Sequence, residues 1–183
     1  MHPLRALLCL TLAAAAPGLA NAAEPTAVAV TIERLARIGR ASGATFSPDG
    51  RQLALVSDLS GVPQIWIVPA DGGWPRLVTS GSDPVGGVRW SPTGDQLAFP
   101  LLPRGGLNRQ VYVVRADGSG MRRLTDGGKE NNNLGDWTAD GKLLTLSSNR
   151  RTASTMDAYL LDPATGRMDM VAELRGVGGI TGV

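Results

Sequence analysis

Short hydrophobic runs alternate with polar turn residues along most of the chain, and the runs return in the same order. The segment TFSPDGRQLAL at 45–55 returns as RWSPTGDQLAF at 89–99 and as DWTADGKLLTL at 136–146. The repeat length of about 46 residues is near the ~40–45 residues of a four-stranded propeller blade. The pattern therefore predicts a repeat protein built from β-strands.

A second motif follows the first in every repeat. QIWIVPADGG at 64–73 returns as QVYVVRADGS at 110–119 and as AYLLDPATG at 158–166. These strands are apolar without alternation, which is typical of strands buried on both faces. The two motifs place six aromatic residues at matched positions, where we expect packing between blades rather than a cage for a substrate: Phe46, Trp90, Trp137, Trp66, Tyr112 and Tyr159.

Tight turns separate the strands. Ser47-Pro48-Asp49-Gly50 has the residues of a type I turn, and Ser91-Pro92-Thr93-Gly94 repeats it. Thr138-Ala139-Asp140-Gly141 keeps the glycine but lacks the proline. We therefore expect Gly50, Gly94 and Gly141 to occupy the same turn position in each repeat.

The predicted fold class is all-β, a partial propeller of three four-stranded antiparallel blades plus the first strand of a fourth. We expect the blades at about 42–80, 86–126 and 133–175, within an incomplete propeller over 42–183. The segment 178–183 resembles the first strand of each repeat. Three blades leave two open edges, so we expect an N-terminal piece of a longer protein. A self-completing oligomer is the alternative.

The N-terminus predicts export. Arg5 precedes an apolar run at 6–16, a Pro-Gly break follows, and Ala20-Asn21-Ala22 matches an A-x-A cleavage site. Residues 1–22 are interpreted as a signal peptide cleaved after Ala22, with a buried N-terminal helix as the alternative. The run is shorter than the ~20 residues of a membrane span. The expected location is periplasmic or secreted. Residues 23–41 are interpreted as a linker with a short helix at 31–38.

Composition narrows the chemistry further. The chain has 24 Gly and 12 Pro, which suits frequent turns, and a formal charge of +2 with no basic run longer than two residues. We therefore expect no nucleic-acid partner. The one histidine, His2, and the one cysteine, Cys9, both lie in the expected signal peptide. The remaining chain then lacks the residues of a Ser-His-Asp or Cys-His site and of a typical zinc site. We expect no catalytic residue, cofactor or metal in it.

Several polar and aromatic residues have two interpretations each. The run Asn131-Asn132-Asn133 is either a binding loop or a connector between blades. Arginines near expected loops either contact peptide carboxylates or are solvated surface charge: Arg104, Arg109, Arg150 and Arg151. Trp74 has no equivalent in the other repeats and either lines an entrance or covers a blade edge. Four aspartates are expected in turns rather than at a metal: Asp49, Asp71, Asp117 and Asp140.

The repeats carry a family resemblance. The stretch SPDGRQLALVSD…PQIWIVPADGGWPRLVT, preceded by TIERLARIG at 31–39, resembles the opening of exported bacterial serine peptidases of the prolyl oligopeptidase family, which includes dipeptidyl-peptidase-like and acylaminoacyl-peptidase-like members. QVYVVRADGSGMRRLTDGGKENNNLGDWTADGK is similar to the same family. TolB-type periplasmic propellers share a very similar unit. The resemblance implies an N-terminal propeller followed by an α/β-hydrolase domain. No catalytic residue transfers, because no G-x-S-x-G elbow occurs here.

Two functions follow from the resemblance. As the non-catalytic propeller of a serine peptidase, the chain would gate or bind peptide substrates, with the C-terminal hydrolase domain as its partner. As a TolB-like module, it would bind an envelope protein and do no chemistry. A truncated remnant without function is a third interpretation. The short lead of ~20 residues before the first blade favours the peptidase, because TolB-like proteins place another small domain there.

Overall fold

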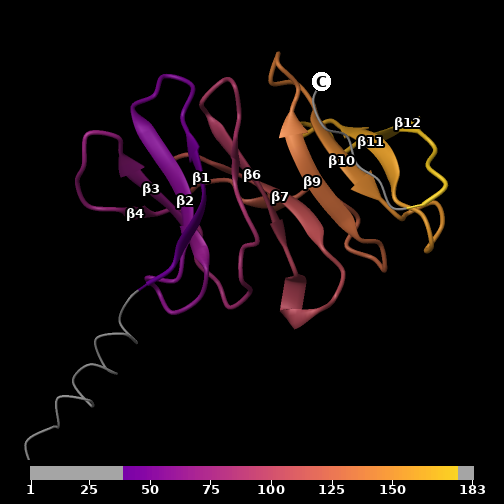
Figure 1. Ribbon diagram of the computed structural model, residues 1–183, viewed down its shortest axis with the longest axis horizontal. Helices are drawn as coiled ribbons and strands as arrows, with labels where there is room; N and C mark the ends of the chain where they lie inside the picture. Colours follow the sequence, from indigo (N-terminus) through magenta and orange to yellow (C-terminus); the bar gives the residue numbers. More distant parts are fainter. Residues whose placement is uncertain (1–38, 177–183) are drawn as a thin grey trace, which may run out of the picture. The chain divides into compact units, whose positions relative to one another are not determined.

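The computed structural model describes residues 39–176, which form three antiparallel sheets of four strands each (Figure 1). Blade 1 comprises β1 (Ala41–Phe46), β2 (Gln52–Ser57), β3 (Gln64–Pro69) and β4 (Arg76–Leu77). Blade 2 comprises β5 (Arg89–Trp90), β6 (Gln96–Leu101), β7 (Gln110–Arg115) and β8 (Arg122–Arg123), with a 3-10 turn at Pro103–Gly105 between β6 and β7. Blade 3 comprises β9 (Asn132–Trp137), β10 (Leu144–Ser148), β11 (Asp157–Leu161) and β12 (Met168–Ala172).

Strand order follows chain order in every sheet, as a propeller blade requires. β5 contacts both β1 and β9, so the first strands of the three blades lie next to one another and the last strands lie outermost. The predicted fold class, an all-β partial propeller, is confirmed for the described residues. The expected signal peptide, the helix at 31–38 and the fourth-blade strand at 178–183 lie outside them. Among residues 39–176, no helix is long and apolar enough to cross a membrane.

The turn between the first two strands is the same in all three blades. The N–H of Gly50 donates to the Ser47 carbonyl at 2.9 Å, and Gly94 and Ser91 form the same bond at 2.9 Å. In blade 3 the Gly141 N–H donates to Thr138 at 2.8 Å, although this turn has no proline. All three glycines have φ between 69° and 80°, a range that costs a residue with a Cβ roughly 1–2 kcal/mol.

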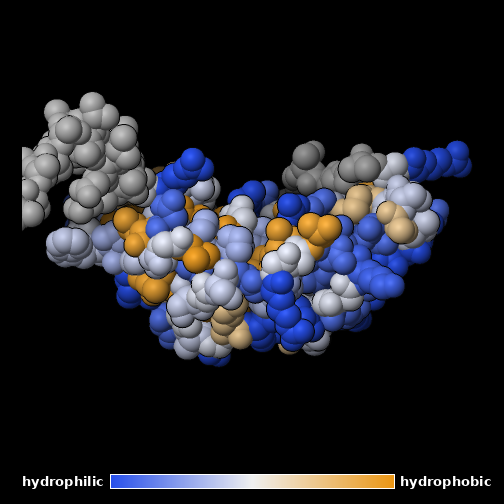
Figure 2. All heavy atoms as spheres, turned by 90° about the horizontal axis from the view of Figure 1, so that it is seen from below, coloured by the Kyte–Doolittle hydropathy of each residue, from blue (hydrophilic) through white to orange (hydrophobic). Residues whose placement is uncertain are grey.

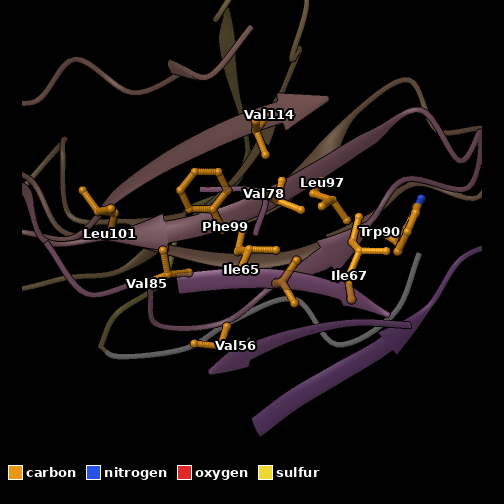
Figure 3. Close-up of a cluster of buried hydrophobic side chains, with 12 residues drawn as sticks. Val56, Ile65, Ile67, Val78, Val85, Trp90, Leu97, Phe99, Leu101 and Val114 are labelled. Carbon is orange, nitrogen blue, oxygen red and sulfur yellow. The ribbon is translucent and has the colours of Figure 1, made fainter. Parts of the chain in front are cut away.

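Blades 1 and 2 share one hydrophobic core. Ile65 and Ile67 of β3 face Leu97 and Phe99 of β6, and Trp90 closes one end of the cluster (Figure 3). Ile65, Leu97 and Phe99 are completely buried. Burying such side chains stabilises a fold by about 1.5–3 kcal/mol each, so this face-to-face packing joins the two sheets.

A second core joins blades 2 and 3 in the same way. Val111 and Val113 of β7 pack against Trp137, Leu144 and other residues of blade 3. The two central strands of blade 2, β6 and β7, are therefore covered on both faces, as their continuous apolar sequence predicts. β3 of blade 1 differs, because Trp66 and Val68 on its other side are only partly buried.

Candidate functional site

A cleft of about 560 Å³ opens beside the innermost strands of the three blades. Its lining is drawn from β1, β5, β6 and β9, together with the segment that leads into β5 and the residue before β7. The lining residues are Gly43, Gly86, Gly87, Val88, Arg89, Pro100, Arg109, Asn133 and Leu134. The repeat architecture thus brings residues from three blades to one surface.

Two arginines provide the charge of this cleft. Arg89 Nε lies 2.8 Å from Asp136 Oδ1 of the next blade, and both side chains remain largely exposed. Arg109 Nη1 donates to Asn133 Oδ1 at 2.6 Å. Each arginine has further N–H donors, since a guanidinium carries five. The cleft is therefore equipped to hydrogen-bond carbonyl and carboxylate groups.

The backbone at the cleft is unusually accessible. A Cβ placed on Gly87 would meet no atom within 4 Å, and one placed on Gly43 would meet only the Gly87 Cα at 3.9 Å. β1, β5 and β9 are also edge strands of their sheets. Exposed edges can pair with an extended peptide through main-chain hydrogen bonds. Together with the two arginines, this geometry suits an extended chain with carbonyl or carboxylate groups.

The asparagine run is mainly an inter-blade connector. The Arg109 N–H donates to Asn131 Oδ1 at 2.9 Å, and Asn131 N–H donates to Asn149 Oδ1 at 2.7 Å. Asn132 is 2% exposed and donates to Gln110 Oε1 at 3.2 Å. Asn133 alone reaches the cleft. Of the three asparagines, the alternative of a binding loop therefore concerns Asn133 alone.

The four candidate arginines lie in different places. Arg109 lines the cleft beside the inner strands. Arg104, with a left-handed φ of 58°, lines a separate cleft of about 640 Å³ together with Tyr112 and Arg123. Arg150 lies 3.3 Å from the exposed carboxylate of Asp126, which fits a surface charge.

Arg151 has a structural contact instead. Its Nε lies 2.6 Å from Asp157 Oδ2, and the Asp157 side chain is completely buried. Its Nη1 also lies 3.1 Å from Glu173 Oε1. The hydrogen bond from Arg151, followed by that from the Leu174 N–H, holds the pKa of Asp157 below its ordinary value. This ion pair fixes the start of β11, so the Arg151 side chain has a structural contact and not a ligand-binding one.

Three of the four candidate turn aspartates, Asp49, Asp117 and Asp140, accept local hydrogen bonds. Asp49 accepts from Ser47 Oγ at 2.5 Å and from the Arg51 N–H at 3.1 Å. Asp140 accepts from Thr138 Oγ1 at 2.7 Å. These hydroxyl contacts lower the pKa of both carboxyl groups. Within residues 39–176, no cluster of three or more His, Cys, Asp or Glu side chains has the geometry to hold a metal ion.

The matched aromatic residues differ in burial from blade to blade. Trp90 and Trp137 are 7% and 8% exposed and pack between blades. Phe46 occupies the same position in blade 1, since it pairs with Leu53 as Trp90 pairs with Leu97, but it is 62% exposed. Trp74 is 95% exposed, which does not fit a cover for a blade edge.

Arg89 was not among the residues singled out from the sequence. It immediately precedes the matched tryptophan of blade 2, and Asp136 holds the same place in blade 3. A signal for the pair was thus present, because complementary charges stand at one repeat position in adjacent blades. The two glycines before β5 carried no such signal.

Comparisons with known proteins fit this architecture. The chain is 32% identical over 101 residues to Tricorn protease homolog 1 of Streptomyces coelicolor, a match covering 55% of this chain and 9% of that protein. It is 35% identical over 80 residues to the Tol-Pal system protein TolB of Anaeromyxobacter dehalogenans, covering 44% of this chain and 18% of that protein. No protein-family model matches the chain.

Among solved structures, the chain superposes on a prolyl endopeptidase with a TM-score of 0.56 at 15% identity, covering 75% of this chain and 22% of that one. The resemblance to TolB-type propellers and to the propeller parts of peptidases is therefore confirmed. The chain spans less than a fifth of the length of these two curated relatives.

Proposed function

We propose that the three blades belong to the non-catalytic propeller of an exported serine peptidase, in which the cleft beside the inner strands receives an extended peptide on its way to a hydrolase domain. The observation that carries the proposal is the convergence of Arg89, Arg109 and accessible glycine backbone on one surface. The similarity to a tricorn protease homolog and to a prolyl endopeptidase supports it. The predicted signal peptide supports export.

The chemistry of the cleft favours binding over cleavage. Arginine donors and an exposed edge strand recognise backbone carbonyls and a terminal carboxylate, and they are largely indifferent to side-chain identity. A gate for varied peptides needs that kind of recognition. In this proposal the nucleophile, its histidine and its aspartate lie in the hydrolase domain, and this propeller selects for unfolded or short chains.

The first experiment uses the protein from its native source. An antibody against residues 129–136 recovers the protein, and its intact mass is read together with labelling by a fluorophosphonate, which reacts with activated serines. A labelled band much longer than 183 residues is expected. A band of any length that does not label contradicts the peptidase proposal.

The second experiment tests the cleft. A fluorescent, unstructured hexapeptide with a free C-terminus is titrated into the purified chain, and the same peptide is then tested with an amidated C-terminus. Arg89→Ala and Arg109→Ala should each weaken binding of the free peptide at least fivefold and bring the two peptides closer in affinity. Arg150→Ala, which removes an arginine away from the cleft, is the matched control. Equal binding by all three variants and the parent chain would exclude the cleft as the peptide site.

A second candidate function is a TolB-like module that binds an envelope protein. The 35% identity to a TolB protein over 80 residues favours it. It predicts a recovered protein that does not label with fluorophosphonate. It also predicts that an envelope protein co-purifies with the native protein and is lost when Arg89 and Arg109 are replaced by alanine.

A further inference from the structure

Each blade presents two different faces, which the strand register defines. In blade 1 the aromatic face consists of the side chains of Phe46, Leu53, Leu55, Trp66, Val68 and Leu77, which pair across the four strands. The opposite, small face consists of Ala54, Val56, Ile65 and Ile67, with Arg76 at its outer strand. The same positions define both faces in blades 2 and 3.

Both interfaces within the chain join the aromatic face of one blade to the small face of the blade before it. Trp90, Leu97 and Phe99 of blade 2 pack on the small face of blade 1. Trp137, Leu144 and Tyr159 of blade 3 pack on Ala98 and the two buried valines of β7. The chain therefore shows twice what an aromatic face is built to contact.

Blade 1 leaves its own aromatic face without such a contact among the described residues. Phe46 is 62% exposed, against 7% for Trp90 and 8% for Trp137 at the same position. Leu53 and Leu55 are partly buried, whereas their equivalents in blades 2 and 3 are buried. Hydrophobic residues reach the surface around blade 1 on the side seen in Figure 2, while hydrophilic residues dominate around blade 3. Blade 1 therefore exposes a sheet face, in addition to the open strand edges expected from the sequence.

Among the described residues, a backbone carbonyl in blade 1 also lacks the contact that its equivalents make in blades 2 and 3. Arg76 Nη2 donates at 2.6 Å to the carbonyl of Ala116, which lies in the turn between β7 and β8 of blade 2. Arg122, the equivalent of Arg76, donates to the carbonyl of Pro163 in blade 3. The equivalent carbonyl in blade 1 belongs to Ala70, and among the described residues it accepts no hydrogen bond.

The glycines in the turn between the third and fourth strands also have different surroundings in blade 1 than in blades 2 and 3. A Cβ on Gly118 of blade 2 would lie 3.1 Å from the Val78 carbonyl oxygen, and one on Gly166 of blade 3 would lie 3.3 Å from that of Leu124. In each case the turn lies against the residue that follows the outer strand of the preceding blade. The equivalent Gly72 of blade 1 would meet nothing within 4 Å. The space that a preceding blade fills elsewhere is open here.

We infer that the aromatic face of blade 1 is the docking surface for one further four-stranded blade. That blade carries alanine and β-branched residues on its facing side, and an arginine on its outer strand donates to the Ala70 carbonyl. The inference goes beyond the proposed function, since it holds for a peptidase propeller and a TolB-like module alike. Its basis is continuity with the two interfaces already present in the chain.

A second copy of the same chain does not supply this blade. The small face of blade 3 carries Thr145 and Ser147 where blade 1 has Ala54 and Val56. Asp169 pairs with Leu160, at the place where blades 1 and 2 have Arg76 and Arg122. A carboxylate cannot donate to a carbonyl, and its charge would face the Ala70 oxygen. The occupant is therefore a blade of different sequence from blade 3.

The test measures how fast a thiol on the aromatic face reacts. In a C9S background, L55C places the probe on that face, and S60C places a control thiol on an exposed loop. The test variant carries a duplicate of residues 41–84 inserted before Ala41, so that the copied small face precedes blade 1 in the natural register. In the parent chain, L55C should react readily with Ellman's reagent, although more slowly than S60C because Leu55 is partly buried. The duplication should slow L55C at least tenfold and leave S60C unchanged.

Changes within the inserted copy separate docking from mere crowding. I65D with I67D in the copy should restore fast labelling, and R76A in the copy should restore it in part. A second insertion, of residues 85–131 before Ala41, provides an independent blade with Ala98, Val111, Val113 and Arg122, in case the first does not fold. A folded insertion that leaves L55C as reactive as before overturns the inference.

The parent chain tests the other occupants. Slow L55C labelling that depends on concentration, with a doubled mass in sedimentation, would identify a second copy as the occupant. Slow labelling in a monomer that becomes fast when residues 23–38 are deleted would identify the N-terminal segment. Either result overturns the inference.

Discussion

The indole nitrogen of Trp137 donates a hydrogen bond to the backbone carbonyl of Arg89, 3.3 Å away. This bond links the innermost strand of blade 3 to that of blade 2, beside the ion pair between Arg89 and Asp136. Trp137 therefore both packs between the two blades and donates a hydrogen bond across them. Blade 1 has Phe46 at this position, which has no N–H to donate and is largely exposed.

The first prediction compares two matched aromatic residues. Trp90→Ala should lower the free energy of unfolding by about 3–5 kcal/mol, because it opens a cavity between two blades. Phe46→Ala should lower it by less than ~1 kcal/mol, because most of that side chain is already in water. Urea denaturation followed by far-UV circular dichroism measures both. Similar losses for the two variants would mean that Phe46 is covered in solution.

The second prediction concerns acid stability and Asp157. Its pKa is lowered in the folded chain by the Arg151 hydrogen bond and the Leu174 N–H, relative to about 3.9 in an unfolded chain. Its contribution to stability is therefore present above pH ~4 and is lost as the pH falls toward the folded pKa. Asp157→Asn should lower the urea midpoint at pH 7 and reduce the further drop between pH 5 and pH 3.

Asp169→Asn is the control for that measurement. Asp169 forms an exposed pair with Arg167 at 3.0 Å. Exposed pairs contribute little, so its urea midpoints should follow those of the parent chain at both pH values. An acid profile of Asp157→Asn identical to that of the parent would refute the assignment.

The third prediction concerns the buried amide of Gln110. Its Oε1 accepts from Thr125 Oγ1 at 2.6 Å, from the Gly127 N–H at 3.1 Å and from Asn132 Nδ2 at 3.2 Å. Gln110→Leu leaves these donors without that acceptor, and a buried unpaired donor costs about 1–3 kcal/mol. The free energy of unfolding should fall by at least ~1–3 kcal/mol. Gln52→Leu, at an exposed position in β2, should change it by less than ~0.5 kcal/mol.

The fourth prediction is a stabilising change in the blade 3 turn. Ala139 stands where the other two turns have Pro48 and Pro92, and the turn hydrogen bond of Gly141 is the same. Proline at a compatible position restricts the unfolded chain and stabilises by about 0.4–1 kcal/mol. Ala139→Pro should therefore raise the urea midpoint. A lower midpoint would show that this turn has a different backbone conformation.

The fifth prediction separates binding from stability at Arg89. The Arg89 and Asp136 side chains are 45% and 70% exposed, so their ion pair should contribute less than ~1 kcal/mol. Arg89→Ala should leave the urea midpoint nearly unchanged. A large loss of stability would mean that any loss of peptide binding by this variant reflects unfolding.

The blade architecture could be predicted from the order of residues alone. The turn motifs and the aromatic residues recur at one period, and a four-stranded unit is encoded by local turn chemistry and by short apolar runs. These signals depend on neighbours in the chain, and in the structure Gly50, Gly94 and Gly141 each donate the same turn hydrogen bond. The general position of Trp90 and Trp137 between blades followed from the same repeat.

Which sheet faces are covered, and which polar residues contact one another, could not be predicted from the sequence because both depend on how the sheets pack. Phe46 and Trp90 look equivalent in sequence, but burial depends on whether another sheet stands in front of them. The three asparagines at 131–133 are neighbours in the chain, and yet two connect blades while Asn133 reaches the cleft with Arg109. Such contacts join residues 18 to 24 positions apart, and their geometry is set by how the sheets pack rather than by any local preference.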